Sequence, residues 1–243
     1  MKHILSYGGG VNSSALFFFL IEKNLPLDLV IFADTGEELK STYEAVKNMQ
    51  LVCLEKKIPF KIVKSHLGNL YDYYWDKKCV MSIQRRDCTG KFKVSPIRKY
   101  LRETFGKKEK FLMYLGITYE EATRMRTSDV LYITNSYPFV DFKITRQGNI
   151  SILDRYGFKA FKSGCKGCVF NRKATWVSML KKDLLEFERH KGLEMNNRRY
   201  PEITISGKYS LLSLEKAVKS QKRLDGFSDS SVSCDVVNGG CFL

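Results

Sequence analysis

The sequence predicts an α/β fold in which a twisted parallel sheet is flanked by helices. Three observations predict it, and each places an apolar strand before a turn or a helix. A short apolar strand at residues 4–5 runs into a glycine turn and a helix over residues 15–21. The continuously apolar stretch 28–32 is typical of a buried parallel strand, and an amphipathic helix follows at 39–57. A third strand at 60–63 then implies right-handed crossovers and a parallel sheet.

The remaining elements continue this alternation and define two regions. We expect residues 1–160 to form the α/β domain and residues 161–243 to form a C-terminal region of helix and loop packed on it. The expected elements are a helix at 94–105, a strand at 111–117, a short helix at 119–126, a strand at 130–137, a helix at 144–156 and one long helix at 173–194. The last fifty or so residues show no strong period. Cys53 lies among apolar neighbours, and we interpret it as a core residue.

The composition favours a folded cytoplasmic protein that binds anions. Hydrophobic residues make up 44% of the 243 residues, which is enough for a packed core. We expect no signal peptide, because the strand and the glycine turn follow Lys2 and His3 at once, and no membrane partner, because no apolar run is long enough to span a bilayer. The formal charge of +15 favours anionic ligands and adds nucleic acid as a partner to consider. Seven cysteines in such a protein favour metal ligation, iron–sulfur binding or redox chemistry over structural disulfides.

The first strand, turn and helix together predict an anion cradle. Glycine lets the backbone approach a phosphate, and the amide groups at a helix start bind it. The turn has neither the third glycine of the dinucleotide fingerprint nor the Gly-Lys-Ser/Thr of a Walker A loop. The cradle is expected to consist of Ser6, Gly8, Gly9, Gly10, Asn12, Ser13 and Ser14.

A Cys-x-x-Cys knuckle, Cys165 and Cys168, predicts a metal site. Two thiolates at this spacing can point at one metal, and the neighbouring glycines allow the tight turn. A site with four thiolates must recruit distant cysteines, Cys88 first, then Cys79, Cys241 or Cys234. The ligand types permit either zinc or an iron–sulfur cluster.

Four motifs, in order along residues 2 to about 170, resemble the phosphoadenosine phosphosulfate (PAPS) reductase-like branch of the PP-loop superfamily. The glycine turn, Ser6-x-x-Gly9-Gly10-x-x-Ser13, resembles the PP-loop, although Asn12 stands at its usual acidic position. Residues 32–37 with 42–44 are similar to the Asp-Thr-Gly and Glu-Thr-Tyr stretch of that family. Residues 88–97 and 116–124 are similar to its Cys-Cys…Lys…Pro and Gly-x-Arg…Arg motifs. The knuckle falls where the iron–sulfur members keep their second cysteine pair.

The resemblance implies an adenine nucleotide alpha hydrolase-like, Rossmann-like fold with a nucleotide across the carboxyl ends of the strands. The ligand would be ATP or PAPS, with Mg²⁺ as an accompanying ion. The cradle would hold its phosphate or sulfate, Asp34, Thr35 and Gly36 would flank it, and Arg124, Arg126 and Lys93 would neutralise charge. Lys93 and Cys241 are the implied catalytic residues. An iron–sulfur cluster, with zinc as the alternative, would be held by Cys88, Cys165, Cys168 and Cys241.

Two departures from the family leave the reaction open. Thr89 stands where the iron–sulfur reductases have a second adjacent cysteine, and the tail around Cys241 lacks the glutamate and histidine of the reductase motif. The main hypothesis is an enzyme acting at the phosphate or sulfate end of the nucleotide, by sulfonucleotide reduction or by ATP-dependent adenylation with pyrophosphate release. A thiol reductant or a sulfur-donor protein would then be its partner.

Two alternatives remain beside that hypothesis. The first is an ATP-dependent enzyme that thiolates tRNA or DNA, with Lys181, Lys182, Arg189, Arg198 and Arg199 as its basic face. The second is a catalytically inactive nucleotide-sensing module, in which Asn12 marks lost catalysis.

Overall fold

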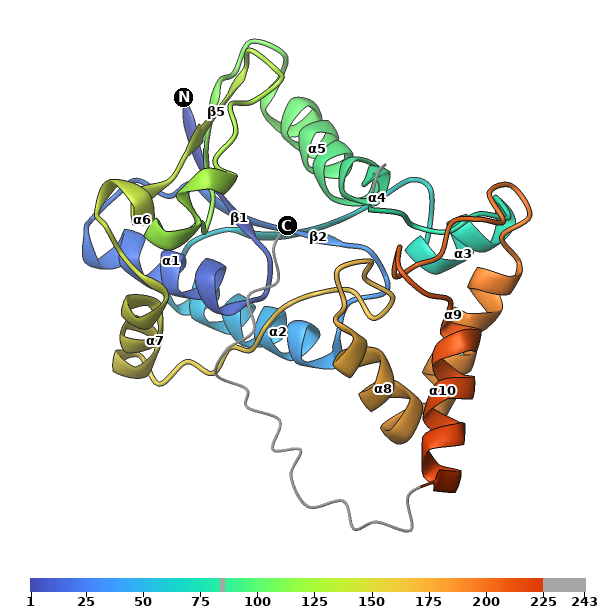
Figure 1. The fold of residues 1–243 in the computed structure, drawn as a ribbon. Helices are drawn as coiled ribbons and strands as arrows, with labels where there is room; N and C mark the ends of the chain where they lie inside the picture. Colours follow the sequence, from blue (N-terminus) through green and yellow to red (C-terminus); the bar gives the residue numbers. More distant parts are fainter. Residues whose placement is uncertain (84–85, 225–243) are drawn as a thin grey trace. The chain divides into compact units, whose positions relative to one another are not determined.

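The computed structural model describes residues 1–83 and 86–224, which form two compact units (Figure 1). The first unit contains residues 1–69 and 89–166, and the second contains 70–88 and the described residues from 167 onwards. The segment 70–88 thus interrupts the first unit in sequence but belongs to the second in space. The boundary expected at residue 160 remains a prediction.

A five-stranded, entirely parallel sheet forms the centre of the first unit, with the strand order β3-β2-β1-β4-β5. The strands are β1 (Lys2–Tyr7), β2 (Leu29–Asp34), β3 (Phe60–Lys64), β4 (Phe111–Tyr114) and β5 (Ile133–Ser136). The chain adds β2 and β3 on one side of β1 and then β4 and β5 on the other. The order therefore reverses between β1 and β4, and such a switch point is where open α/β sheets bind ligands.

Helices and turns connect these strands much as the sequence predicts. They are α1 (Val11–Glu22), α2 (Lys40–Glu55), α5 (Ser95–Phe105), α6 (Pro138–Asp141) and α7 (Arg146–Arg155), with a π-helical turn η1 (Gly90–Val94) and a 3-10 helix η2 (Tyr119–Arg124). The parallel α/β fold expected from the sequence is confirmed. None of the helices in the described ranges combines the length and the hydrophobicity needed to cross a membrane.

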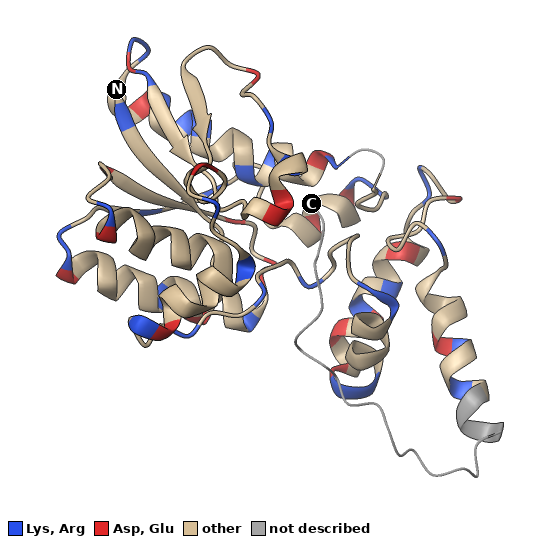
Figure 2. Cartoon of the chain, turned by 60° about the vertical axis from the view of Figure 1, so that its left-hand side comes forward, with Lys and Arg blue, Asp and Glu red and all other residues tan. Residues whose placement is uncertain are grey.

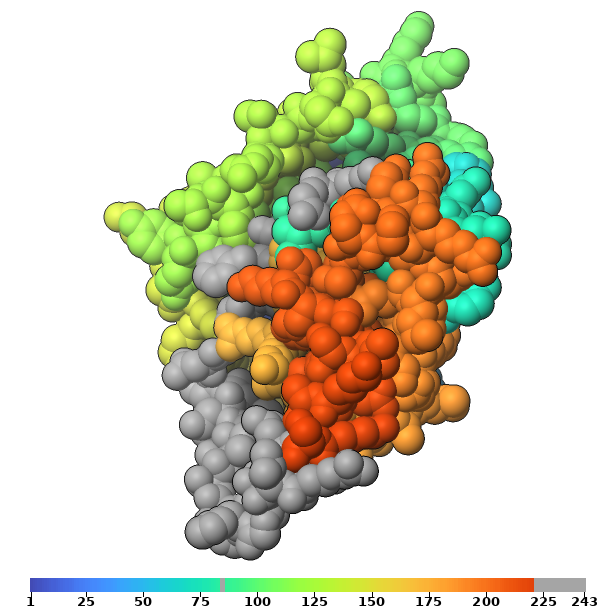
Figure 3. All heavy atoms as spheres, turned by 45° about the vertical axis from the view of Figure 1, so that its right-hand side comes forward, coloured from blue at the N-terminus to red at the C-terminus, as the bar shows by residue number. Residues whose placement is uncertain are grey.

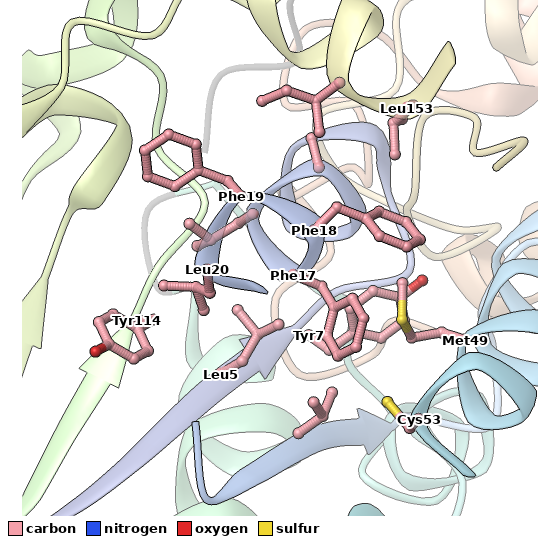
Figure 4. Packing of buried hydrophobic residues seen from close by; sticks show 14 of the residues in the cluster. Leu5, Tyr7, Phe17, Phe18, Phe19, Leu20, Met49, Cys53, Tyr114 and Leu153 are labelled. Atoms are coloured by element: carbon pink, nitrogen blue, oxygen red, sulfur yellow. The ribbon is translucent and has the colours of Figure 1, made fainter. Parts of the chain in front are cut away.

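The sheet separates two hydrophobic clusters, because side chains alternate between its faces. Helix α1 is buried over Ala15 to Leu20, and Figure 4 shows Phe17 beside Tyr7 of β1 and Met49 of α2. This cluster holds Leu5, Tyr7, Phe17, Phe18, Phe19, Val30, Phe32, Met49 and Cys53, whereas Ile4, Leu29, Ile31, Ala33, Ile97 and Leu101 belong to the other. Burying one phenylalanine ring contributes about 2–3 kcal/mol, so this packing fixes the position of α1. The interpretation of Cys53 as a core residue is confirmed.

The second unit is helical, and one sequence prediction about it is wrong. Its helices are α3 (Leu70–Asp76), α8 (Lys173–Lys182), α9 (Leu184–Met195) and α10 (Leu211–Leu224), and α4 (Asp87–Thr89) begins in it. The long helix expected at 173–194 is two helices, because Asp183 leaves the helical conformation (φ −144°, ψ 69°) and accepts a hydrogen bond from the amide of Glu186. Lys191 of α9 pairs with Glu215 of α10 at 2.6 Å. Figure 3 shows the side chains of these C-terminal helices in orange to red.

Candidate functional site

The glycine turn joins β1 to α1 at the switch point of the sheet. Gly10 is the N-cap of α1, and Ser13 in the first turn of the helix folds back over the loop. Its Oγ accepts hydrogen bonds from the amides of Gly8 (3.1 Å) and Gly10 (3.3 Å). Ser13 thus fixes the shape of the turn. The amides at the start of any α-helix have no partner within the helix, so this turn presents N–H groups and the positive helix end to an anion.

Two of the three glycines are required by their surroundings. Gly9 has a φ of +70°, and a Cβ there would lie 2.7 Å from Cγ2 of Thr42. A Cβ on Gly10 would lie 2.6 Å from Oγ of Ser163. A Cβ on Gly8 would meet nothing closer than 3.8 Å. The turn is therefore walled by α2 on one side and by the loop that carries Ser163 on another.

The two serines at the ends of the cradle differ in their surroundings. Ser14 is fully buried, and its hydroxyl lies 3.0 Å from that of Tyr7, which also donates to the carbonyl of Ala45. Burial raises the pKa of Tyr7, so this hydroxyl remains protonated and continues to donate. Ser6 is half-buried in β1, in register with Ile31 of β2. The hydroxyl of Ser14 thus faces the core, where it holds α1 against β1.

Asn12 links the turn to the segments after β4. Its Nδ2 donates to Oε2 of Glu121 at 3.1 Å, and its Oδ1 accepts from Nδ2 of the fully buried Asn149 at 3.1 Å. Glu121 also pairs with Arg124 in η2. Gly116 permits this close approach, because a Cβ there would lie 3.0 Å from the backbone carbon of Asn12. The structure therefore connects the predicted residues Asn12 and Arg124 through Glu121, which the prediction did not include.

Asp34 organises the loop at the carboxyl end of β2. Its Oδ1 accepts from the amide of Gly36 and from the hydroxyl of Tyr43, both at 2.8 Å. Lys64 of β3 pairs with Oδ2 at 3.3 Å. Burial and the contact with Asp34 raise the pKa of Tyr43, so its hydroxyl remains a donor. Gly36 has a φ of +78°, and the loop turns there toward the site.

Glu38 brings together three residues that the sequence singled out separately. Its Oε1 accepts from the hydroxyl of Thr35 (3.0 Å), from the ammonium of Lys93 (2.9 Å) and from the thiol of Cys165 (3.6 Å). The Thr35 hydroxyl lies 3.7 Å from the same sulfur. The side chain of Glu38 is 1% exposed.

Backbone pairing holds the Cys165 loop beside Glu38. Glu38 and Cys165 form an antiparallel β-bridge, the amide of Leu39 donates to the carbonyl of Gly164 at 2.9 Å, and that of Lys166 donates to the carbonyl of Glu37 at 2.8 Å. Sequence reasoning missed Glu38. The one available signal was its place among the polar residues that follow β2.

The predicted metal ligands are distributed over both units. Cys165 lies in the first unit, whereas Cys88 and Cys168 lie in the second, where Cys88 is part of α4. Cys241 lies outside the described residues. The ligand set therefore remains a prediction, as does the catalytic role of Cys241.

Fold and site together define the class: a doubly wound α/β protein with a glycine turn and a helix start at its switch point. Residues 2–133 match the family model described as the phosphoadenosine phosphosulfate reductase domain. The chain belongs to this family, and the resemblance noted in the sequence is confirmed. The family is one of enzymes, whose members bind a nucleotide.

Two solved structures are among those similar to this chain. One is the PAPS reductase from Candida auris in a phosphate complex (13% identity, TM-score 0.46, covering 66% of this chain and 75% of that one). The other is the U34-tRNA thiolase NcsA from Methanococcus maripaludis with its [4Fe-4S] cluster (14% identity, TM-score 0.49, covering 90% and 81%). No curated protein matches the sequence.

Proposed function

We propose that this chain binds the phosphate or sulfate end of PAPS or ATP in the glycine turn and catalyses transfer at that end. The observation that carries the proposal is the turn itself. Ser13 shapes it, Thr42 and Ser163 wall it, and the positive end of α1 stands behind it. Anion binding at such a turn requires no base-specific contact, so it serves either nucleotide.

The charged residues around the turn support a transfer reaction. Arg124 and Lys93 are each held by a carboxylate, Glu121 and Glu38 respectively, so each cation has a defined position before substrate arrives. A preorganised cation stabilises the charge that develops on a phosphate or sulfate oxygen during bond cleavage. Both oxygens of Glu121 already hold protein groups, Arg124 and Asn12, so an accompanying Mg²⁺ would be held by the phosphates of the nucleotide.

The two versions of the reaction differ in the attacking group. With PAPS, a cysteine thiolate such as that of Cys241 would form an S–S bond to the sulfate sulfur. The S–O bond to adenosine 3′,5′-bisphosphate would break, and a thiol reductant would then release sulfite. With ATP, an acceptor oxygen would attack the α-phosphorus and release pyrophosphate, which leaves an adenylated acceptor for sulfur or nitrogen to displace.

We further propose that Cys88, Cys165, Cys168 and Cys241 hold an iron–sulfur cluster, with zinc as the alternative. Two residues separate Cys165 from Cys168, so the chain itself keeps these thiols near one another, and thiolates suit both metals. Anaerobic purification followed by metal analysis and visible absorption spectroscopy tests this. We expect bound iron together with the broad visible absorption of a thiolate-bound cluster, and we expect both to be lost in Cys168→Ser. Zinc without colour would establish the alternative, and absence of both metals would overturn the proposal.

One observation favours nucleic-acid modification as a second candidate function. A groove of about 550 Å³ follows α5, where Arg98, Lys99 and Arg102 line it together with Asp129, which pairs with Arg98. The guanidinium of Arg102 stacks on the ring of Tyr132 at 4.0 Å. Cations interleaved with an aromatic ring suit a phosphate backbone with exposed bases. Figure 2 shows further basic residues on both units, in keeping with the net charge of +15.

A product assay tests the proposed function. The protein is purified without oxygen and incubated with Mg-ATP and, separately, with PAPS and an excess of a dithiol reductant, and the products are identified by mass spectrometry. We expect AMP with pyrophosphate from ATP, with water taking the place of the acceptor oxygen, or sulfite with adenosine 3′,5′-bisphosphate and oxidised dithiol from PAPS. Tight binding without turnover would instead support the sensing module. Intact nucleotides together with no binding of either one would overturn the proposal.

A further inference from the structure

Glu38 is a buried carboxylate whose partners are all residues of the candidate site. Its Oε1 takes the Thr35 hydroxyl, the Lys93 ammonium and the Cys165 thiol, which come from three separate segments of the first unit. Its other oxygen, Oε2, is buried and accepts no hydrogen bond from any group in the described residues. Buried carboxylates that serve only structure have their oxygens satisfied, because an unpaired one destabilises the fold.

Asp34, the other carboxylate at the end of β2, provides the contrast. Both of its oxygens are engaged, by the Gly36 amide, by Tyr43 and by Lys64, and these partners shape the loop itself. Glu38 lacks such complete pairing and instead contacts the predicted catalytic lysine. Because the unpaired buried oxygen of Glu38 destabilises the fold, we look for a role of this residue other than stability.

The exposed fractions of the Lys93 and Glu38 side chains indicate which of the two can contact a ligand. The side chain of Lys93 is 37% exposed, whereas that of Glu38 is 1% exposed. The ammonium of Lys93 can therefore reach both solvent and an incoming anion, while the carboxylate that holds it cannot. Without the charge of Glu38, Lys93 would lose the ion pair that fixes its ammonium at 2.9 Å, and the cost of ordering this group would then oppose nucleotide binding.

We propose that Glu38 is a positioning residue: it orients the ammonium of Lys93 toward the phosphate or sulfate of the bound nucleotide and does not itself touch the substrate. This inference rests on the proposed function, and it assigns to Glu38 the task of holding the Lys93 ammonium in place before the nucleotide binds. The same carboxylate also accepts the hydroxyl of Thr35, so that one side chain sets the geometry of both residues.

A double-mutant cycle on nucleotide affinity tests the inference. Calorimetric titrations with Mg-ATP and with PAPS compare the unaltered protein with Glu38→Gln, Lys93→Met and the double variant. Glutamine keeps the volume of the side chain and removes its charge. Glu103→Gln is the matched control, because it removes a carboxylate from the exposed pair with Lys99 on α5. Thermal unfolding of every variant is recorded in parallel.

The expected pattern separates positioning from structure. Glu38→Gln weakens binding of the nucleotide by about tenfold or more, the scale of one charge-assisted hydrogen bond, and the double variant binds no more weakly than Lys93→Met alone. In Glu38→Gln the amide oxygen can still accept from Thr35 and Lys93 while the NH₂ group takes the place of Oε2, so the unfolding midpoint of this variant stays close to that of the unaltered protein. Glu103→Gln binds like the unaltered protein.

Other outcomes overturn the inference in distinguishable ways. A lowered unfolding midpoint with unchanged affinity would make Glu38 a structural residue. Losses of affinity that multiply in the double variant would make Glu38 and Lys93 independent. Binding of neither nucleotide by the unaltered protein would overturn the proposed function and this inference with it.

Discussion

Gly10→Ala probes the wall of the glycine turn at its contact with Ser163. The backbone at Gly10 (φ −110°, ψ 175°) is extended, so alanine adopts it without strain. The added Cβ, however, would lie 2.6 Å from Oγ of Ser163, 3.1 Å from its Cβ and 3.3 Å from its backbone nitrogen. The hydroxyl can rotate away, but the other two atoms cannot move without shifting the loop.

The magnitude follows from three opposing terms. Overpacking costs about 1–3 kcal/mol, and replacing glycine by alanine at an N-cap adds about 0.5–1 kcal/mol. The lower entropy of the unfolded chain returns about 0.4–1 kcal/mol. We therefore expect Gly10→Ala to lower the free energy of unfolding by about 0.5–3.5 kcal/mol, and to weaken nucleotide binding because the turn moves.

Urea unfolding with parallel nucleotide titrations measures both effects. Ser163→Gly in the Gly10→Ala background removes the two closest contacts and should restore most of the lost stability. Gly8→Ala is the control for stability, because its Cβ would meet nothing within 3.8 Å. The reasoning is refuted if Gly10→Ala is as stable as Gly8→Ala, or if Ser163→Gly restores nothing.

Three further substitutions test other parts of the structure. Asn12→Asp places a carboxylate against that of Glu121 and should lower the free energy of unfolding by about 1–2 kcal/mol at pH 7. The loss should be smaller at pH 4 and absent when Glu121→Gln is also present, and an equal loss at both pH values would contradict the contact. Burial raises the pKa of the Cys53 thiol to about 12. The stabilisation that the protonated thiol gives to the fold is therefore complete below about pH 8.5, the pKa of the thiol in the unfolded chain, and is lost as the pH rises toward 12. Cys53→Ala should therefore reduce the fall in unfolding free energy over that interval, and an unchanged slope would contradict this. Lys99→Ala with Arg102→Ala should weaken tRNA or DNA binding and reduce its log–log salt slope by about 2; an unchanged slope would exclude the α5 groove as the contact.

The sheet and the turn could be predicted because their signals are local. The apolar run that became β2 is buried on both faces, and its composition alone indicates a parallel strand. Gly9 and Gly10 have neighbours so close that a side chain at either position would clash with them. Cys53 could be predicted as a core residue because its apolar neighbours are adjacent in the sequence.

The role of Glu38 could not be predicted, because distant residues determine it. In sequence it is the second member of an acidic pair in a polar loop, a context typical of solvent exposure. Its burial comes from Lys93 and from the strand-like pairing with Cys165, far along the chain. No local pattern encodes that pairing.

Two features of the second unit were missed for a related reason. Asp183 stands between apolar residues at helical spacing, so a continuous helix was expected where a cap ends one helix and begins the next. Helix α10 begins where the half-buried Glu194 accepts a hydrogen bond from the amide of Leu211 at 2.6 Å. A cap supplied from another helix leaves no signature beside the helix it stabilises.

The central claim is that the glycine turn binds the phosphate or sulfate of an adenine nucleotide. Its most direct test is the amide NMR spectrum of the ¹⁵N-labelled protein during titration with PAPS and with Mg-ATP. The account predicts that the largest shifts, saturating with one nucleotide, are those of the amides of residues 8–13. Saturable shifts that leave these amides unchanged, or no shifts with either nucleotide, would contradict it.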